Sequence, residues 1–248
     1  NPISYWESNV FGTVNLLRIM QKYECYQIVF SSSASIYGFS KSSYVDENSN
    51  LNPINPYAKT KVAIEDILNQ LFNSSPNKWK IACLRYFNPI GAHPSGLIGE
   101  NPLGIPNNIF PHLIKVAAGK EKIFKIFGNS WPTNDGTGVR DYIHIMDLAD
   151  GHFAAMKYLS INKPQIINLN LGTGRGTSVL ELIRNFEKIN KCRINFIFAN
   201  KRSGDIASLV ANNRSALHKL DWEPKRTLDD MCRDGWNWEL KNPFGYKE

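Results

Sequence analysis

Gln27-Ile-Val-Phe-Ser-Ser-Ser-Ala-Ser-Ile-Tyr-Gly38 is the stretch that decides the fold of this chain. Residues 27–30 are largely apolar and β-branched, which is typical of a short buried strand. A helical period of apolar residues precedes them over 9–22, and a second one follows over 57–72, before another apolar run at 81–86. Strands that alternate with helices favour parallel pairing through crossover connections. The sequence therefore predicts an α/β fold around a parallel sheet.

The alternation becomes looser beyond residue 88. Residues 88–104 are rich in Gly, Pro, Asn and His, which predicts an irregular stretch that is a boundary or a ligand loop. Further helices are expected near 107–118, 147–159, 178–189 and 227–241, and further strands near 123–127, 141–145, 166–171 and 193–199. Gly172-Thr-Gly-Arg-Gly176 lacks the third glycine of a dinucleotide fingerprint, so we interpret it as a tight strand-to-helix turn, with Thr177 or Ser178 as the helix cap.

Composition excludes several classes of protein. A length of 248 residues suits one large α/β domain, or one domain with a small companion. With 42% hydrophobic and 21% charged residues, the chain is not of the disordered type. No apolar run approaches about 18 residues, which predicts a soluble protein with no membrane partner. The net charge of +7 comes from scattered bases without interleaved aromatic residues, so no nucleic-acid partner is expected.

The four cysteines indicate neither a disulfide framework nor a metal site. Cys25, Cys83, Cys192 and Cys232 lie far apart, with no CxxC pair and no histidine at ligand spacing. We expect reduced thiols, no metal and a cytoplasmic protein. The chain starts without a Met and without a targeting segment, which hints at a missing N-terminus.

Tyr57 and Lys61 carry the strongest chemical signal. Their spacing of four at the start of a predicted helix places both side chains on one face. A tyrosine that acts as a base near neutral pH needs its pKa lowered by roughly three units, or about 4 kcal/mol. A neighbouring ammonium supplies stabilisation of the required sign. The alternative is an ordinary exposed helix face that carries both residues by chance.

Ser33 supports the functional interpretation of that pair. It follows the predicted strand directly, and open α/β sheets bind ligands at the carboxyl ends of their strands. The alternative is a polar loop in which the hydroxyl satisfies a backbone group.

Together these residues resemble the extended short-chain dehydrogenase/reductase family, and within it the UDP-galactose 4-epimerases. The resemblance runs from Pro2 to the C-terminus. The stretches that carry it are Ser31-Ser-Ser-Ala-Ser-Ile-Tyr-Gly38, Pro56-Tyr-Ala-Lys-Thr-Lys61, Leu84-Arg-Tyr-Phe-Asn88, Gly104-Ile-Pro-Asn-Asn108, Asp135-Gly-Thr-Gly-Val-Arg-Asp-Tyr-Ile-His144, Asn170-Leu-Gly-Thr-Gly174 and Gly204-Asp205.

The resemblance implies a Rossmann-like, doubly wound parallel sheet with a smaller substrate-binding α/β domain. It assigns 1–88 to the C-terminal part of the NAD-binding domain and 89–248 mainly to the substrate domain, with about 141–172 returning to the Rossmann sheet. The family begins with a strand, a glycine-rich phosphate loop and a helix, and roughly 90 residues of that kind are absent here. We expect a truncated chain that, alone, binds NAD poorly and turns over no sugar.

The activity implied is the interconversion of UDP-glucose and UDP-galactose, in galactose metabolism, through transient NAD-dependent oxidation at sugar C4. Tyr57 would take the proton of the 4-hydroxyl, Ser33 would hydrogen-bond the 4-oxygen, and Lys61 would hold the nicotinamide ribose and lower the tyrosine pKa. Asn9 and Phe87 would also contact NAD.

The resemblance also assigns residues to the UDP-sugar and implies a homodimer. The carried-over substrate contacts are Ser33, Asn88, Asn108, Ile109, Lys125, Phe127, Arg140, Tyr142, Arg202, Asp205 and Leu209. Arg140 and Arg202 suit a diphosphate, because guanidinium groups bind phosphate oxygens in pairs. At the position of Leu209 the family carries a residue that gates N-acetylated sugars, and leucine is intermediate between a permissive small residue and a restrictive tyrosine.

Two other functions stay open on the same scaffold. A dehydratase or decarboxylase is the nearer one, but dehydratases of the superfamily carry an acidic pair where this chain reads Ser33-Ala34-Ser35. A non-catalytic NAD(P)-binding regulator is the other, although such proteins usually lose Tyr or Lys of the pair that this chain retains.

Overall fold

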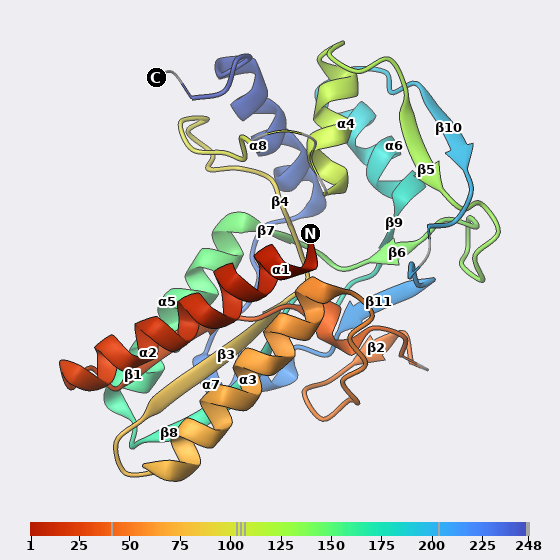
Figure 1. The fold of residues 1–248 in the computed structure, drawn as a ribbon. Coiled ribbons are helices and arrows are strands. Elements are labelled where there is room, and N and C mark those ends of the chain that lie inside the picture. The colour runs from red at the N-terminus through yellow and green to blue at the C-terminus, as the bar shows by residue number, and fades with distance from the viewer. Residues whose placement is uncertain (41, 103, 105, 107, 203, 247–248) are drawn as a thin grey trace. The chain divides into compact units, whose positions relative to one another are not determined.

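The structure is a computed structural model of the 248-residue chain and describes residues 1–40, 42–102, 104, 106, 108–202 and 204–246. The chain divides into two compact units, whose elements are labelled in Figure 1. Unit 1 comprises residues 1–87, 150–171 and 211–223, and unit 2 comprises residues 88–149, 172–210 and 224–248. Segments of the two units therefore alternate along the chain.

Unit 1 is built around a three-stranded parallel sheet in the order β1-β3-β8. Its elements are α1 (Pro2–Tyr5), a π-helical turn (Trp6–Phe11), α2 (Gly12–Lys22), β1 (Gln27–Ser31), a 3₁₀ turn (Ala34–Tyr37), β2 (Tyr44–Val45), α3 (Pro56–Ser74), β3 (Lys80–Tyr86), most of α5 (Ile145–Ile161), β8 (Gln165–Leu171) and α7 (Arg214–Leu220). The register pairs Ser31 with Leu84 and Tyr86 with Leu171, so the carboxyl ends of the strands meet at one edge. The predicted α/β class with parallel strands is confirmed.

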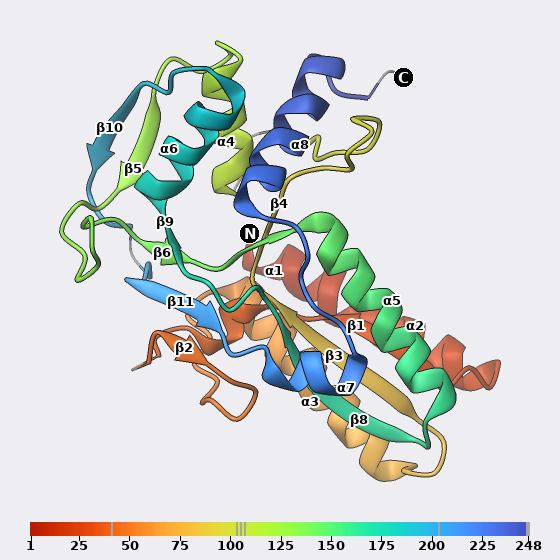
Figure 2. The ribbon, with the colours of Figure 1, turned by 180° about the vertical axis from the view of Figure 1, so that it is seen from behind.

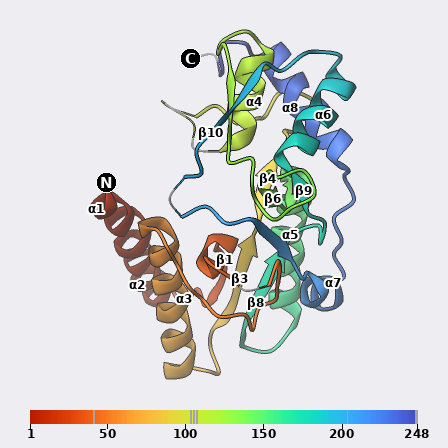
Figure 3. The ribbon, with the colours of Figure 1, turned by 90° about the vertical axis from the view of Figure 1, so that its right-hand side faces the viewer.

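Helices cover both faces of this sheet. Figure 3 shows α2 and α3 on one face and α5 on the other, and Figure 2 shows α5 and α7 from behind. The core on the first face combines Leu17 of α2, Ile64 and Leu68 of α3, and Ile81 of β3, each at most 5% exposed. Burial of each such side chain contributes about 1.5–3 kcal/mol, so this interface holds the two helices on the sheet.

Unit 2 contains short strand pairs covered by helices. Its elements are β4 (Asn88–Ile90), α4 (Ile109–Ala117), β5 (Phe124–Phe127), β6 (Val139–Arg140), β7 (Tyr142–His144), β9 (Thr177–Ser178), α6 (Val179–Asn190), β10 (Phe196–Ala199), most of β11 (Ser208–Ala211) and α8 (Leu228–Lys241). The strand pairs β4–β7, β5–β10 and β6–β11 are parallel, and β6–β9 is antiparallel. A core that includes Phe110, Phe186 and Met231 joins α4, α6 and α8, which Figure 2 shows packed together beside β5.

Several elements were not predicted. The stretch from Asn88, expected to be irregular, begins with β4, because Asn88–Ile90 pair with Tyr142–His144. The short strands β2, β9 and β11 and the helix α7 also lack a sequence signal of their own. The helix expected from residue 9 begins at Pro2, and α5 begins at Ile145, where the backbone N–H of Met146 donates to His144 Nδ1 (3.0 Å).

The turn and the helix cap predicted at residues 172–178 are confirmed. The turn at residues 172–176 leads into α6, whose N-cap is Ser178: its Oγ accepts from the Glu181 N–H (3.0 Å), and the Ser178 N–H donates to the Glu181 carboxylate (3.3 Å). In the part of the chain that the structure describes, no helix has the length and apolarity needed to cross a membrane.

The core of unit 1 predicts a contrast between two neighbouring positions on α5. Leu159 is fully buried, whereas Ile161 is 76% exposed. Leu159→Ala should lower the free energy of unfolding by about 2–5 kcal/mol, because it removes buried methyl groups and leaves a cavity. Ile161→Ala should change it by less than about 1 kcal/mol. Urea denaturation of both variants measures the difference, and equal losses would contradict the assigned packing.

Candidate active site

The first turn of α3 presents Tyr57 and Lys61. Asn55 caps the helix by accepting the Ala58 N–H on its side-chain oxygen (2.8 Å), and Pro56 occupies the first helical position, where a missing N–H costs nothing. The Lys61 Nζ lies 5.4 Å from the centre of the Tyr57 ring, so the two side chains share one face as predicted.

The serine run at the end of β1 meets that helix face. Lys61 Nζ donates to the Ser31 carbonyl oxygen (2.9 Å), and hydrogen bonding links Tyr57 to Ser33. Ser33 Oγ itself accepts the Ser35 N–H (3.2 Å) and the Ser35 hydroxyl (2.9 Å). Since its lone pairs are occupied, the Ser33 hydroxyl is set up as a donor toward a neighbouring oxygen. The structure therefore brings Ser33, Tyr57 and Lys61 together.

The expected lowering of the Tyr57 pKa is wrong for these side chains by themselves. Burial, helped by the neighbouring Tyr86 and Tyr5, raises the pKa of Tyr57 to about 12, although the hydrogen bond with Ser33 acts in the opposite direction. Burial also lowers the pKa of Lys61. The physical reason is that burial disfavours the phenolate, while the Lys61 ammonium, which lies 5.4 Å from the Tyr57 ring centre, donates its hydrogen bond to the Ser31 carbonyl oxygen. Use of Tyr57 as a base near neutral pH requires a further positive charge beside it.

Tyr86 and His152 belong to this cluster, and the sequence analysis missed both. Tyr86 hydrogen-bonds with Tyr57, and its ring centre lies 6.3 Å from that of His152. A His152 ring nitrogen lies 2.9 Å from Ser31 Oγ. Tyr86 stands within the quoted stretch Leu84–Asn88, so its place at the end of β3 could have signalled it; His152 lies on a distant helix and gave no signal.

Asn9 and Phe87, the other two residues expected to contact NAD, lie in different segments of unit 1. Asn9 is in the π-helical turn, where its Nδ2 donates to Thr60 Oγ1 (2.9 Å), next to Lys61 on α3. Such turns often occur at functional sites. Phe87 is 5% exposed and follows β3.

The donors of this cluster fit the ribose of a nicotinamide cofactor. Lys61 uses one of its three N–H groups on the Ser31 carbonyl, and no described carboxylate lies within 4.0 Å of it. Two donors thus stay available for neighbouring hydroxyl oxygens, which is the chemistry that a ribose presents.

Unit 2 contains a cavity of about 450 Å³. The substrate candidates that line it are Asn88, Asn108, Ile109, Lys125, Phe127, Arg140, Tyr142, Arg202 and Asp205. Leu209 is not among its lining residues: it is 7% exposed on β11, paired with Arg140. Ile105 and Asn107 of the quoted motif at 104–108 lie outside the described residues.

Arg140 gives the cavity its anion-binding character. Its guanidinium donates to the Val139 and Ile206 carbonyl oxygens (2.8 and 2.9 Å). Burial lowers its pKa, and within the described ranges no carboxylate lies within 4.0 Å of it. The Tyr142 hydroxyl is buried and has no hydrogen-bond partner among the residues that the structure describes. A half-buried cation and a buried hydroxyl in this condition favour an anionic, oxygen-rich ligand.

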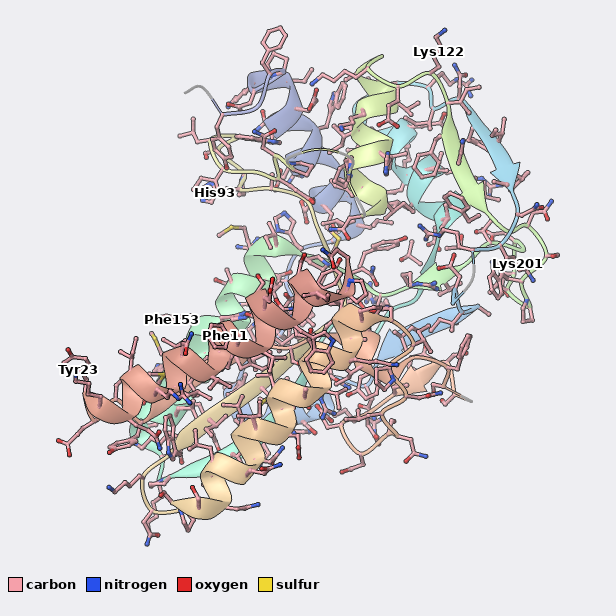
Figure 4. The ribbon with its side chains drawn as sticks, in the orientation of Figure 1. Phe11, Tyr23, His93, Lys122, Phe153 and Lys201 are labelled. Atoms are coloured by element: carbon pink, nitrogen blue, oxygen red, sulfur yellow. The ribbon has the colours of Figure 1, made fainter. Side chains whose placement is uncertain are left out.

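Aromatic and basic side chains form another part of the cavity wall. The Arg202 guanidinium lies 4.5 Å from the Phe127 ring centre, and Arg202 Nε donates to Asp205 (3.1 Å). Lys201, labelled in Figure 4, lies 4.1 Å from the ring centre of Trp131, which lines the cavity. Trp131 was missed by the sequence analysis, because a single tryptophan in a turn-rich segment carries no periodic signal.

Asp141 lies between β6, which carries Arg140, and β7, which carries Tyr142. Its fully buried carboxylate accepts the Thr173 and Gly174 N–H groups (2.8 and 2.9 Å) and the Thr173 hydroxyl (2.6 Å). The turn after β8 thus holds the residue that separates the two ligand candidates. Among the described residues, no group of three or more His, Cys, Asp or Glu could hold a metal ion.

Comparisons of the sequence with known proteins find a matching family and related proteins. The family described as GDP-mannose 4,6 dehydratase matches residues 1–235. The chain is 50% identical to UDP-glucose 4-epimerase 2 of Oryza sativa subsp. japonica over 99% of its own length and 60% of that protein, and 48% identical to the UDP-glucose 4-epimerase of Bacillus subtilis over 99% and 72%. The chain thus spans about 60–70% of the length of these relatives.

Solved structures are similar over the same extent. A UDP-glucose 4-epimerase from Stenotrophomonas maltophila, with bound NAD and formylated UDP-arabinopyranose, matches with a TM-score of 0.95 and 44% identity, covering 98% of this chain and 71% of that one. One from Bifidobacterium longum, in complex with NAD+ and UDP, matches with a TM-score of 0.93 and 43% identity, covering 99% and 72%.

The raised pKa of Tyr57 predicts a pH dependence of stability. The Tyr57 pKa is about 12 in the folded state and 10.0 for an ordinary tyrosine. The stability that the protonated Tyr57 phenol contributes to the fold is therefore fully present below pH 10.0 and is lost as the pH rises toward 12. Tyr57→Phe should therefore lose less stability than the wild type over this window. Urea denaturation on both sides of pH 10.0 measures it, with Tyr44→Phe, whose side chain is 59% exposed, as the control. Identical alkaline losses in wild type and Tyr57→Phe would contradict the assigned environment.

Proposed function

Since the chain belongs to the UDP-glucose 4-epimerase family of extended short-chain dehydrogenase/reductases, we propose that the protein interconverts UDP-glucose and UDP-galactose with NAD as its cofactor. The observation that carries the proposal is the meeting of Ser33, Tyr57 and Lys61 in unit 1, from segments more than 20 residues apart in the chain. The relatives named above, of which two were crystallised with NAD, support the choice of cofactor.

Each side chain of the cluster has a definite task in this proposal. Tyr57 accepts the proton of the sugar 4-hydroxyl and returns it after the sugar has been reduced on its other face. Ser33 donates to the 4-oxygen, and its bonds from Ser35 orient that donor. Lys61, with Asn9 and Phe87, binds the cofactor on the ribose side. NAD bound beside these residues would supply reversible hydride transfer at C4 and the positive charge that lowers the Tyr57 pKa.

The cavity of unit 2 is proposed to bind the UDP moiety. Arg140 and Arg202 provide guanidinium donors for the diphosphate, and Phe127 provides an aromatic face for the uracil. The unpartnered Tyr142 hydroxyl would gain a hydrogen bond on binding. We keep as part of the proposal the assignment of residues 1–88 to NAD binding and of 89–248 mainly to the substrate, with about 141–172 returning to the Rossmann sheet.

A dehydratase is the second candidate, because the matching family carries that description. Elimination of water requires an acid beside the serine, and the position after Ser33 holds Ala34, followed by Ser35, whose hydroxyl donates back to Ser33. This arrangement favours epimerisation.

The test is Tyr57→Phe in the full-length protein, with UDP-galactose as substrate. The turnover number should fall at least about 100-fold, since general acid–base catalysis contributes about 10²–10⁴-fold, while bound NAD is retained. Tyr44→Phe, which removes an exposed phenol, should keep the wild-type rate. A wild-type protein that releases a dehydrated keto-sugar, or a Tyr57→Phe variant with full activity, would contradict the proposal.

A homodimer in the cytoplasm completes the proposal. Leu16, Ile19 and Tyr23 form an exposed apolar stripe along α2, at least 50% exposed, and Figure 4 shows Tyr23 at the outer end of that helix. All four cysteines are free thiols, as suits a reducing compartment. Leu16→Glu together with Ile19→Glu should shift the protein to monomers in sedimentation equilibrium. A wild-type protein that is monomeric at every concentration would contradict the dimer.

A further inference from the structure

Glu65 continues the helix face that carries Tyr57 and Lys61. The three residues are spaced by four along α3, so their side chains lie in one row. Unlike the other two, Glu65 is almost completely enclosed, with 4% of its side chain exposed. A buried carboxylate needs partners for its charge and for its lone pairs, and those partners show what it does.

One partner is a guanidinium and the other is a serine hydroxyl. Arg85 donates to Glu65 through Nη2 (2.6 Å) and Nε (3.1 Å), a paired geometry that neutralises the carboxylate. The Ser32 hydroxyl donates to Glu65 Oε1 (2.5 Å). Ser32 is itself fully buried and precedes Ser33.

The three serines at the end of β1 thus meet the three residues of the row. Ser33 contacts Tyr57, the Ser31 carbonyl accepts from Lys61, and Ser32 donates to Glu65. Two of these contacts involve groups that the reaction itself would use. The third lies away from the reacting groups and is made by side chains that are wholly enclosed.

We propose that Glu65, through Ser32, is a positioning residue that sets the location of the Ser33 hydroxyl relative to the Tyr57 oxygen. The inference rests on the proposed function only for its kinetic readout. Because Ser32 and Ser33 are consecutive, an anchor on the Ser32 side chain restricts the backbone torsions that orient Ser33. Arg85 holds the carboxylate in turn, and its Nη1 donates to the Tyr37 hydroxyl (3.1 Å) and to the Glu47 carbonyl oxygen (3.0 Å).

Ser32→Ala is the sharpest test, because it removes one hydroxyl and leaves the Glu65–Arg85 pair intact. In the full-length protein the turnover number should fall by between about 10- and 100-fold, the range that a misplacement of about 1 Å produces, with the KM for UDP-galactose within about threefold. The groups facing Tyr57 are Ser33, Lys61, Tyr5 and Tyr86, and of these Ser33 is the one whose hydrogen bond lowers the Tyr57 pKa. The rising limb of the pH–rate profile should therefore move to higher pH.

A matched control separates positioning from general loss of stability. Ser215→Ala removes a hydroxyl that donates to Glu47 (3.2 Å), at a distance from the serine run, and should keep the wild-type turnover number and pH limb even if it lowers the melting temperature. Glu65→Asp retains the charge for Arg85 but withdraws it from Ser32. Glu65→Asp should reproduce the effect of Ser32→Ala. The double variant that combines both changes should lose no more of its turnover number than either single variant.

A measurement without turnover keeps this inference apart from the proposed function. The ¹³C resonance of the Tyr57 ζ-carbon, assigned by its loss in Tyr57→Phe, should shift in Ser32→Ala and stay in place in Ser215→Ala. An inactive wild type would contradict the proposed function alone. An unchanged Tyr57 resonance in Ser32→Ala, or additive losses of turnover in the double variant, would overturn the positioning role.

Discussion

A carboxylate that is shut away from water organises unit 1. Glu65 and Arg85 are each about 4% exposed at the side chain, and removal of one member of such a pair typically costs about 3–5 kcal/mol, because the other charge is left without a partner. The pair joins α3 to the end of β3. Its hydrogen bonds continue to Ser32 after β1 and, through the Tyr37 hydroxyl, to Asn170 on β8 (2.6 Å). The carboxyl ends of all three strands are thereby tied to the helix that presents Tyr57.

The chemistry of the cluster follows from this rigidity. Enclosure by packed strands and helices raises the pKa of Tyr57 to about 12, so the phenol is a poor base until a positive charge lies beside it. Under the proposed function, such a site would couple proton abstraction to the presence of a cationic cofactor. In unit 2, burial also disfavours the charged form of a side chain, but because Arg140 is a cation its pKa is lowered rather than raised. An anionic ligand beside it would stabilise that positive charge.

Much of the scaffold could be predicted from periodicity, and the exceptions have a common cause. The strands at 27–31, 80–86 and 165–171 and the helices α3, α6 and α8 are long enough for their apolar pattern to be read. The short strands β4 and β6 carry no such pattern, because they exist only through pairing with a distant segment. The same holds for the site: the motif at 57–61 is local, whereas His152 reaches Ser31 from 121 positions away.

By itself, the sequence determined that Tyr57 and Lys61 share a helix face and that a serine run follows a short apolar strand. These are consequences of backbone geometry over a few residues. Only the tertiary structure decided that the Lys61 ammonium points at a carbonyl rather than at the phenol, and that Glu65 anchors Ser32. Burial and the direction of a long side chain depend on which distant segments enclose it, and pKa values and hydrogen-bond partners depend on that enclosure.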